Sequence, residues 1–92
     1  MAYSIRALTP ISVTIRYFAA ARSAASVEEE DVIVPAGTTV ATLKDRLARR
    51  NGQLGQVLQK CSYLCDGVAV RNPHIALTSG QTVDVLPPFA GG

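Results

Sequence analysis

The strongest constraint on the fold is a helical stripe that lies between two segments of alternating hydrophobicity. Val40, Leu43 and Leu47 recur at i, i+3 and i+7, which is the spacing of an amphipathic helix with one buried face. Residues 11–17 and 82–85 instead alternate between apolar and polar side chains, with the period of a half-buried strand. A chain with strands at both ends and a helix between them can bury that helix against a sheet formed by the strands.

Two turn signals predict further strands. Residues 32–34 continue the alternation up to Pro35-Ala36-Gly37, so we expect a second strand that forms a hairpin with the first. Asp66-Gly67 lies in the middle of residues 63–70 and predicts a tight two-residue hairpin. We interpret the acidic run 28–31 as the solvated edge of the second strand rather than as a metal site.

The helical segment has its own start and stop signals. Thr38 or Thr39 can cap the first turn through its side-chain oxygen, and Asn51-Gly52 is expected to end the helix in the left-handed conformation. The apolar residues within 54–58 suggest a second, short helix. Residues 19–26 are small and polar, and we expect a loop there.

In this order the elements predict an α+β domain in which one main helix crosses one face of a mixed sheet. A hairpin followed by such a helix is the order of the ubiquitin-like β-grasp fold, in which the last strand lies beside the first. The chain has 92 residues, of which 48% are hydrophobic, enough for one core and too few for two. We expect an N-terminal extension over 1–10, the domain over 11–86 and a projecting tail over 87–92.

The composition argues against several classes of function. Only 17% of the residues are charged and the net charge is +2, which disfavours a disordered tail and gives no reason to expect a nucleic-acid partner. No apolar run approaches the roughly 18 residues of a membrane span, and residues 1–10 lack the apolar core of a secretory signal. We therefore expect a cytoplasmic protein.

Cys61, Cys65 and His74 are too few to build a structural zinc site, which takes four nitrogen or sulfur ligands. We predict no metal site. In the reducing cytosol a disulfide between the two cysteines would rarely persist. Packing in or near the core is therefore the favoured interpretation of both cysteines.

The end of the sequence is its most informative segment. Pro87-Pro88 cannot continue strand pairing, so the residues after it must project from the domain. Gly91 and Gly92 have no side chain, so a terminus made of them can enter a passage too narrow for other residues. The carboxylate of Gly92 is then well placed to attack the α-phosphate of ATP in a partner's pocket. From Leu86 onward the tail reaches roughly 23 Å when extended.

Three segments resemble one family, the small subunits of molybdopterin synthase, which are MoaD-like sulfur carriers. The ending Val83-Asp84-Val85-Leu86-Pro87-Pro88-Phe89-Ala90-Gly91-Gly92 is similar to the ending of those proteins. Tyr17-Phe18-Ala19-Ala20-Ala21-Arg22 resembles their first strand and the loop after it, and residues 34–40 resemble their junction between strand and helix. The resemblance covers about residues 11–92 and leaves the N-terminal extension outside.

The resemblance implies a function in which no side chain of this chain is catalytic. An E1-like enzyme would adenylate the C-terminal carboxylate of Gly92 with ATP, and a persulfide would convert it to a thiocarboxylate. The tail would then enter the large, MoaE-like subunit and donate sulfur to a pyranopterin precursor. The chain would thus be a non-catalytic, sulfur-donating subunit with no permanently bound cofactor. The candidate partner-binding residues are apolar or in the tail: Phe18, Leu86, Phe89, Ala90, Gly91 and Gly92.

Other functions share the same tail. A carrier could supply sulfur for thiamine or for a sulfur-containing amino acid, although Pro87-Pro88 favours the molybdopterin group. A ubiquitin-like modifier would instead form an isopeptide bond through Gly92, and a plain interaction module would carry out no chemistry.

Overall fold

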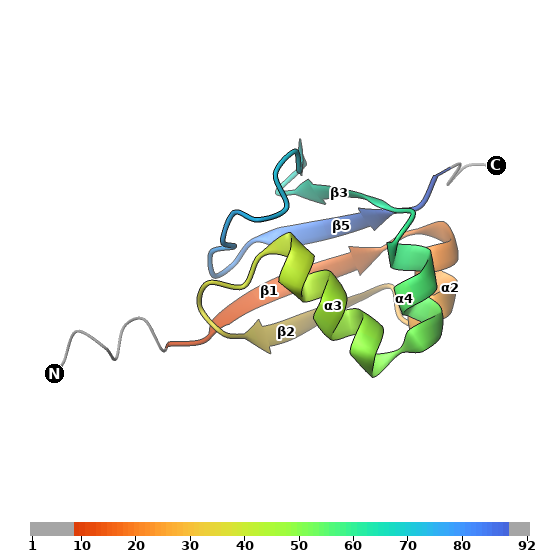
Figure 1. Ribbon diagram of the computed structural model, residues 1–92, viewed down its shortest axis with the longest axis horizontal. Helices are drawn as coiled ribbons and strands as arrows, with labels where there is room; N and C mark the ends of the chain where they lie inside the picture. The colour runs from red at the N-terminus through yellow and green to blue at the C-terminus, as the bar shows by residue number, and fades with distance from the viewer. Residues whose placement is uncertain (1–8, 89–92) are drawn as a thin grey trace, which may run out of the picture.

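The computed structural model describes residues 9–88, which contain five strands and three helices (Figure 1). In the sheet the strands follow the order β2-β1-β5-β3-β4, and α3 lies across one face. The bounds of the elements are β1 Ile11–Tyr17, α2 Ala19–Ala25, β2 Glu29–Val34, α3 Val40–Arg50, α4 Gly52–Leu58, β3 Ser62–Cys65, β4 Val68–Ala69 and β5 Thr82–Leu86.

The two terminal strands lie side by side at the centre of the sheet. β1 pairs with β2 in the antiparallel sense and with β5 in the parallel sense, so that Tyr17 lies opposite Val85. β5 also pairs antiparallel with β3, which makes the sheet mixed. This arrangement confirms the predicted ubiquitin-like β-grasp fold, including the placement of the last strand beside the first.

The main helix forms where its sequence predicts it. Thr39 is the N-cap, and its side chain and that of Thr42 each accept a bond from the other's backbone N–H. This reciprocal pairing satisfies two N–H groups that a helix start otherwise leaves without partners. Val40, Leu43 and Leu47 are all buried and form the apolar stripe that packs on the sheet.

The prediction of a loop over residues 19–26 is wrong, because α2 occupies Ala19–Ala25. Alanine has the highest helix propensity of any residue, and this segment contains five alanines. Ala21 and Ala24, three residues apart, are buried against the core. Their spacing was the signal of a helical face, and it is easily missed because alanine contributes little hydrophobicity.

The predicted left-handed stop at Asn51 is also wrong. Asn51 is extended, with φ −150° and ψ 104°, and its side-chain oxygen caps α4 by accepting from the backbone N–H of Leu54 at 3.1 Å. Its amide nitrogen donates to the backbone oxygen of Ala24 at 2.9 Å, which ties α2 to the junction of α3 and α4. One asparagine therefore starts the second helix instead of closing the first in a left-handed turn. The second helix itself, predicted from residues 54–58, is confirmed.

The Asp66-Gly67 hairpin is present as predicted. Both residues have positive φ, 49° and 81°, which is the geometry of a two-residue turn that matches the twist of its strands. The Asp66 side chain also accepts from the backbone N–H of Thr82 at 2.9 Å, so the turn is tied to the start of β5.

Gly55 allows α3 and α4 to approach closely. A Cβ at position 55 would lie 2.8 Å from the Cβ of Ala48, closer than such atoms can approach, whereas a Cβ at Gly52 would meet nothing within 4 Å. We expect Gly55→Ala to lower the free energy of unfolding by about 1 kcal/mol, because overpacking strain of about 1–3 kcal/mol exceeds the gain in helix propensity of about 1 kcal/mol. Urea unfolding measures this change.

The matched control is Gly52→Ala, which makes the same change in the same helix and should leave stability equal or higher. Adding Ala48→Gly to the Gly55→Ala variant should relieve the contact. If Gly55→Ala and Gly52→Ala had the same free energy of unfolding, α3 and α4 would be able to move apart at position 55 without loss of stability.

A buried tyrosine makes the fold sensitive to high pH. The Tyr17 hydroxyl donates to Glu30 at 2.7 Å, and Arg50 contacts the same carboxylate oxygen at 2.6 Å. Burial, followed by the bond to Glu30, raises the pKa of Tyr17 well above its usual range. Burial likewise raises the pKa of Tyr63, whose hydroxyl donates to the backbone oxygen of Leu58 at 2.7 Å.

Both tyrosines should make the domain less stable above about pH 10, the pKa of a free tyrosine. Above that pH the unfolded chain releases protons that the folded chain keeps, so the free energy of unfolding falls as pH rises. Tyr17→Phe should make this fall shallower in urea unfolding between pH 8 and about pH 11. Tyr63→Phe is the matched variant and should act in the same direction. If the free energy of unfolding fell equally steeply with pH in both variants and in the unchanged chain, the two tyrosines would not be the cause of the fall.

Candidate functional site: the exit of the C-terminal tail

The parallel pairing of β1 and β5 brings two predicted partner-binding residues to one end of the sheet. Both strands end there, and the backbone N–H of Phe18 donates to the backbone oxygen of Val85 at 3.2 Å. Phe18 follows β1 directly, and Leu86 is the last residue of β5. Since side chains alternate between the faces of a sheet, both lie on the face opposite Tyr17 and Val85, which are buried under the helices.

The face that carries Phe18 and Leu86 is partly exposed and carries charges. Both residues are half-buried, which leaves apolar surface available to a partner. The Arg16 guanidinium lies over the Phe18 ring, 5.4 Å from its centre, and its Nε is 3.1 Å from an Asp84 carboxylate oxygen. The pair holds Arg16 against the ring, so an apolar patch lies next to a fixed ion pair.

Pro87-Pro88 follows β5 and borders residues of α2 and α4. Pro87 is buried and Pro88 is exposed, so the change from core to surface occurs between them. A shallow hollow of about 300 Å³ borders both prolines and is lined otherwise by α2 and α4 residues and the turn after α4: Ala20, Gln56, Val57 and Lys60. No sequence pattern predicts these four residues, because they become neighbours of Pro87-Pro88 only through the packing of α2 against α4.

Four of the predicted partner-binding residues fall outside the described residues. They are Phe89, Ala90, Gly91 and Gly92, and the last of them carries the carboxylate expected to react. The structure therefore describes the support from which the tail departs, and Phe18 and Leu86 beside it.

The two cysteines are half-buried and unpaired. Cys61 donates to the backbone oxygen of Val57 at 3.2 Å, and burial raises the pKa of both thiols. A raised pKa lowers the fraction of thiolate, the form that attacks sulfur or binds metal. Both cysteines pack against the core cluster, as the sequence interpretation expects.

Residues 9–88 hold no cluster of three side chains of His, Cys, Asp or Glu placed as metal ligands. None of the helices in that range has the length and apolar character needed to cross a bilayer.

The comparison with protein families decides the relationship. The model of the ThiS family matches residues 15–92, which takes in the whole sheet apart from the first residues of β1 and continues through the tail. The chain belongs to the ThiS family. The matched residues include Phe18, Leu86 and Gly92. Every predicted partner-binding residue of this ThiS family member therefore lies within the region that the family model covers.

Three solved structures are similar in fold to this ThiS family member. The Pyrococcus furiosus protein described as a putative molybdopterin converting factor, subunit 1, is 26% identical with a TM-score of 0.77, over 85% of this chain and 98% of that one. Small archaeal modifier protein 1 of Haloferax volcanii is 24% identical with a TM-score of 0.74, over 88% and 99%. A chain in the Helicobacter pylori complex of subunits 1 and 2 of molybdopterin-converting factor is 22% identical with a TM-score of 0.61, over 89% of this chain and 100% of that one. The curated proteins contain no match.

Proposed function

We propose that this chain is a sulfur carrier that acts as the small subunit of a molybdopterin synthase. The observation that carries the sulfur-carrier proposal is the family match, which continues through Pro87-Pro88 to Gly92. The likeness to the Pyrococcus furiosus protein described as a putative molybdopterin converting factor, subunit 1, supports the proposed pathway. The described domain supports the sulfur-carrier proposal, because the chain reaches the surface between Pro87 and Pro88, directly after Leu86, which lies on the same face of the sheet as Phe18. In this function the chain contributes a carboxylate, a narrow tail and a docking surface, and the partners contribute the acids, bases and ATP.

The chemistry requires only the C-terminal carboxylate of this chain. A carboxylate oxygen of Gly92 attacks the α-phosphorus of ATP. The bond between that phosphorus and the bridging oxygen breaks, and pyrophosphate leaves with its electron pair. The terminal sulfur of a protein persulfide then attacks the acyl adenylate, and AMP leaves. A second thiol cleaves the resulting acyl disulfide, so that a thiocarboxylate remains on Gly92 and the two protein sulfurs form a disulfide.

Two partners follow from this scheme. An E1-like enzyme would bind ATP and the tail, and a large, MoaE-like subunit would accept the thiocarboxylate and hold the pyranopterin precursor. The likeness to subunit 1 in the Helicobacter pylori complex supports a second subunit as a partner. We propose that the chain binds no cofactor of its own and works in the cytoplasm, where ATP and reduced thiols are abundant.

A ubiquitin-like modifier is the second candidate function. It is favoured by the likeness to small archaeal modifier protein 1, which has the same fold as this chain. Both functions begin with adenylation of Gly92 and differ in the nucleophile that follows, a persulfide in one case and a lysine amine in the other. A carrier for thiamine or for a sulfur-containing amino acid would differ only in the acceptor.

Intact-mass measurement tests the proposal. The purified chain is incubated with ATP, a sulfur donor and a candidate E1-like enzyme, and then with a MoaE-like subunit and a pyranopterin precursor. We expect the mass to rise by the replacement of one oxygen with sulfur in the first step, and to return in the second as the precursor gains sulfur. Conjugates on lysine in place of a thiocarboxylate would favour the modifier. A thiocarboxylate that the MoaE-like subunit never discharges would indicate another acceptor.

The cysteines should not be required for this transfer. We expect a variant with both Cys61→Ala and Cys65→Ala to lose about 1 kcal/mol or more of stability, because both side chains are half-buried. It should still be charged and discharged at the rate of the unchanged chain in the intact-mass assay. Loss of transfer in a folded double variant would mean that a cysteine relays the sulfur.

A further inference from the structure

A groove on the β3 side of α3 carries positive charge and no negative charge. It has a volume of about 490 Å³ and is lined by the start of α3, by residues 61–64 of β3 and the turn before it, and by residues 69–73. We call it the β3 groove. Its charged lining residues are Lys44 and Arg71, and neither forms an ion pair within residues 9–88. Most of the other lining residues are apolar, among them Val40, Leu64 and Val70.

Two further titratable side chains line the β3 groove, and both are uncharged at neutral pH. The Tyr63 hydroxyl donates to the backbone oxygen of Leu58 at 2.7 Å, and burial raises the pKa of Tyr63. Burial also raises the pKa of Cys61, whose thiol donates to the backbone oxygen of Val57 at 3.2 Å. Neither group offsets the two positive charges, so the lining is complementary to an acidic ligand.

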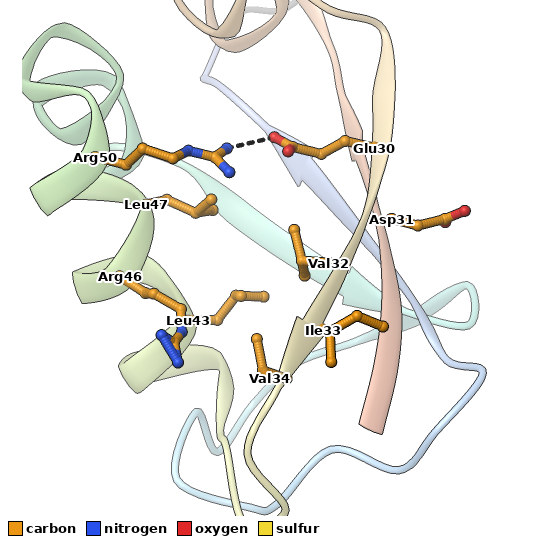
Figure 2. Close-up of a pocket in the computed structure, with 9 residues that line it drawn as sticks. All are labelled: Glu30, Asp31, Val32, Ile33, Val34, Leu43, Arg46, Leu47 and Arg50. Carbon is orange, nitrogen blue, oxygen red and sulfur yellow. Dashed lines mark hydrogen bonds and ion pairs between the residues drawn. The ribbon is translucent and has the colours of Figure 1, made fainter. Parts of the chain in front are cut away.

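The opposite side of α3, which faces β2, has no such excess of charge. The pocket on that side is lined by two acidic residues and two arginines: Glu30, Asp31, Arg46 and Arg50. Their charges sum to zero, and Figure 2 shows the Arg50 guanidinium directed at Glu30, with 2.6 Å between the bonded nitrogen and oxygen. The acidic strand β2 and the short strand β4 lie at opposite edges of the sheet. The excess positive charge is therefore a property of the β3 groove and not of α3 as a whole.

The walls of the β3 groove are held by backbone hydrogen bonds. The N–H of Ala41 donates to the oxygen of Pro73 at 3.0 Å, and the N–H of Val70 donates to the oxygen of Tyr63 at 2.9 Å. The Lys44 ammonium lies over the Tyr63 ring, 5.4 Å from its centre, a contact that favours one position for the charge. A ligand thus meets a groove that is already formed, which lowers the entropic cost of binding.

We propose that the β3 groove binds an acidic segment of a partner protein, with carboxylates at Lys44 and Arg71 and an apolar side chain against the uncharged lining. The planar guanidinium of Arg71 can hold a carboxylate by two parallel hydrogen bonds, and Lys44 acts as a point charge. A protein is favoured over a small molecule because Ser62, Ala69 and Arg71 are exposed, so a small ligand would stay largely in water, whereas small-molecule pockets bury most of their ligand. The β3 groove contains no residue of the tail or its exit, so this site stands whether or not the proposed sulfur-carrier function holds.

A defined peptide tests the proposal on the full chain. The probe is acetyl-Glu-Leu-Glu-Leu-Glu-amide, and the matched control has glutamine in place of each glutamate, so that length, backbone and apolar side chains are the same. In an NMR titration we expect the acidic peptide to shift the amide signals of residues 61–64 and 69–73, with a dissociation constant below about 1 mM. The glutamine peptide should bind at least about tenfold more weakly. Equal binding of the two peptides, shifts confined to another surface, or no binding would overturn the proposal.

Removal of single charges tests the two cations. Lys44→Gln and Arg71→Gln should each weaken binding of the acidic peptide about fivefold, and Lys44→Arg, which keeps the charge, should bind it within about twofold of the unchanged chain. Arg46→Gln is the matched control, because it removes one positive charge from the same helix on the side that faces β2. An equal loss of affinity in Arg46→Gln would reduce the effect to net charge and overturn the site.

Two further measurements distinguish a partner protein from other occupants of the β3 groove. Inorganic phosphate, at the concentration used for the acidic peptide, should leave the signals of residues 61–64 and 69–73 unshifted. Equal shifts with phosphate would identify a simple anion site, contrary to the proposal. If these signals changed with protein concentration in the absence of peptide, a second copy of this chain would be the occupant, which would also overturn the proposal.

Discussion

Appending one residue after Gly92 should abolish the formation of a thiocarboxylate while the domain remains folded. The added residue moves the reacting carboxylate by about 3.5 Å. A displacement of about 1 Å can lower the rate roughly a hundredfold, because adenylation requires the carboxylate in line with the α-phosphate. An appended alanine also brings a Cβ into a passage that two glycines predict to be narrow. Deleting Gly92 should have the same effect, because the tail then falls short by the same distance.

The assay is intact mass after incubation with ATP, a sulfur donor and the E1-like enzyme that charges the unchanged chain. The matched control is one residue added before Met1, which lengthens the chain equally and should be charged at the normal rate. Urea unfolding of all variants should coincide, since no residue of the described core, which runs from Val13 to Val85, is changed. If the extended chain were charged and donated sulfur without first being trimmed, the C-terminal carrier mechanism would be wrong.

Periodicity was sufficient to predict the elements whose apolar residues are large. The strands β1 and β5 and the helix α3 bury Val, Ile and Leu at regular spacing, so the pattern in the sequence is strong. The prediction failed for α2, whose buried residues are Ala21 and Ala24, because small side chains give a weak pattern even where they pack closely. It also failed at Asn51, whose side chain caps α4 and also bonds to the backbone oxygen of Ala24, a residue distant in sequence.

The sequence predicts the residues of the candidate site that belong to the tail or adjoin β1 and β5, but not the residues that tertiary packing brings beside them. Phe18 and Leu86 were candidates because the family resemblance implies an apolar docking surface, and the parallel pairing of β1 and β5 makes them neighbours. Gln56 and Lys60 have no motif of their own, and they border the exit only because α2 and α4 pack together.

Changing Phe89 to aspartate should weaken the complex with the large subunit by about thirtyfold or more. The expected reason is the loss of a buried aromatic anchor, a type of contact that typically contributes about 2 kcal/mol or more to an interface. Phe18 and Leu86 stand beside the exit and leave apolar surface against which a partner can close. The melting temperature should change little, because β5 and its core residues end before Phe89. Titration calorimetry with the large subunit measures the affinity, and thermal unfolding measures the stability.

Ile75→Asp provides the matched control for the anchor. Ile75 is 65% exposed and lies in the loop before β5, next to Ala76, which forms a bridge with Thr39 at the start of α3, whereas the tail follows the end of β5. This variant replaces an exposed apolar residue with the same acid, so it tests whether any added charge weakens the complex. We expect its affinity for the large subunit to be unchanged within about twofold, as is usual for surface substitutions outside an interface. If Phe89→Asp instead lowered the melting temperature as much as truncation of a core leucine such as Leu47, Phe89 would belong to the core and not to the interface.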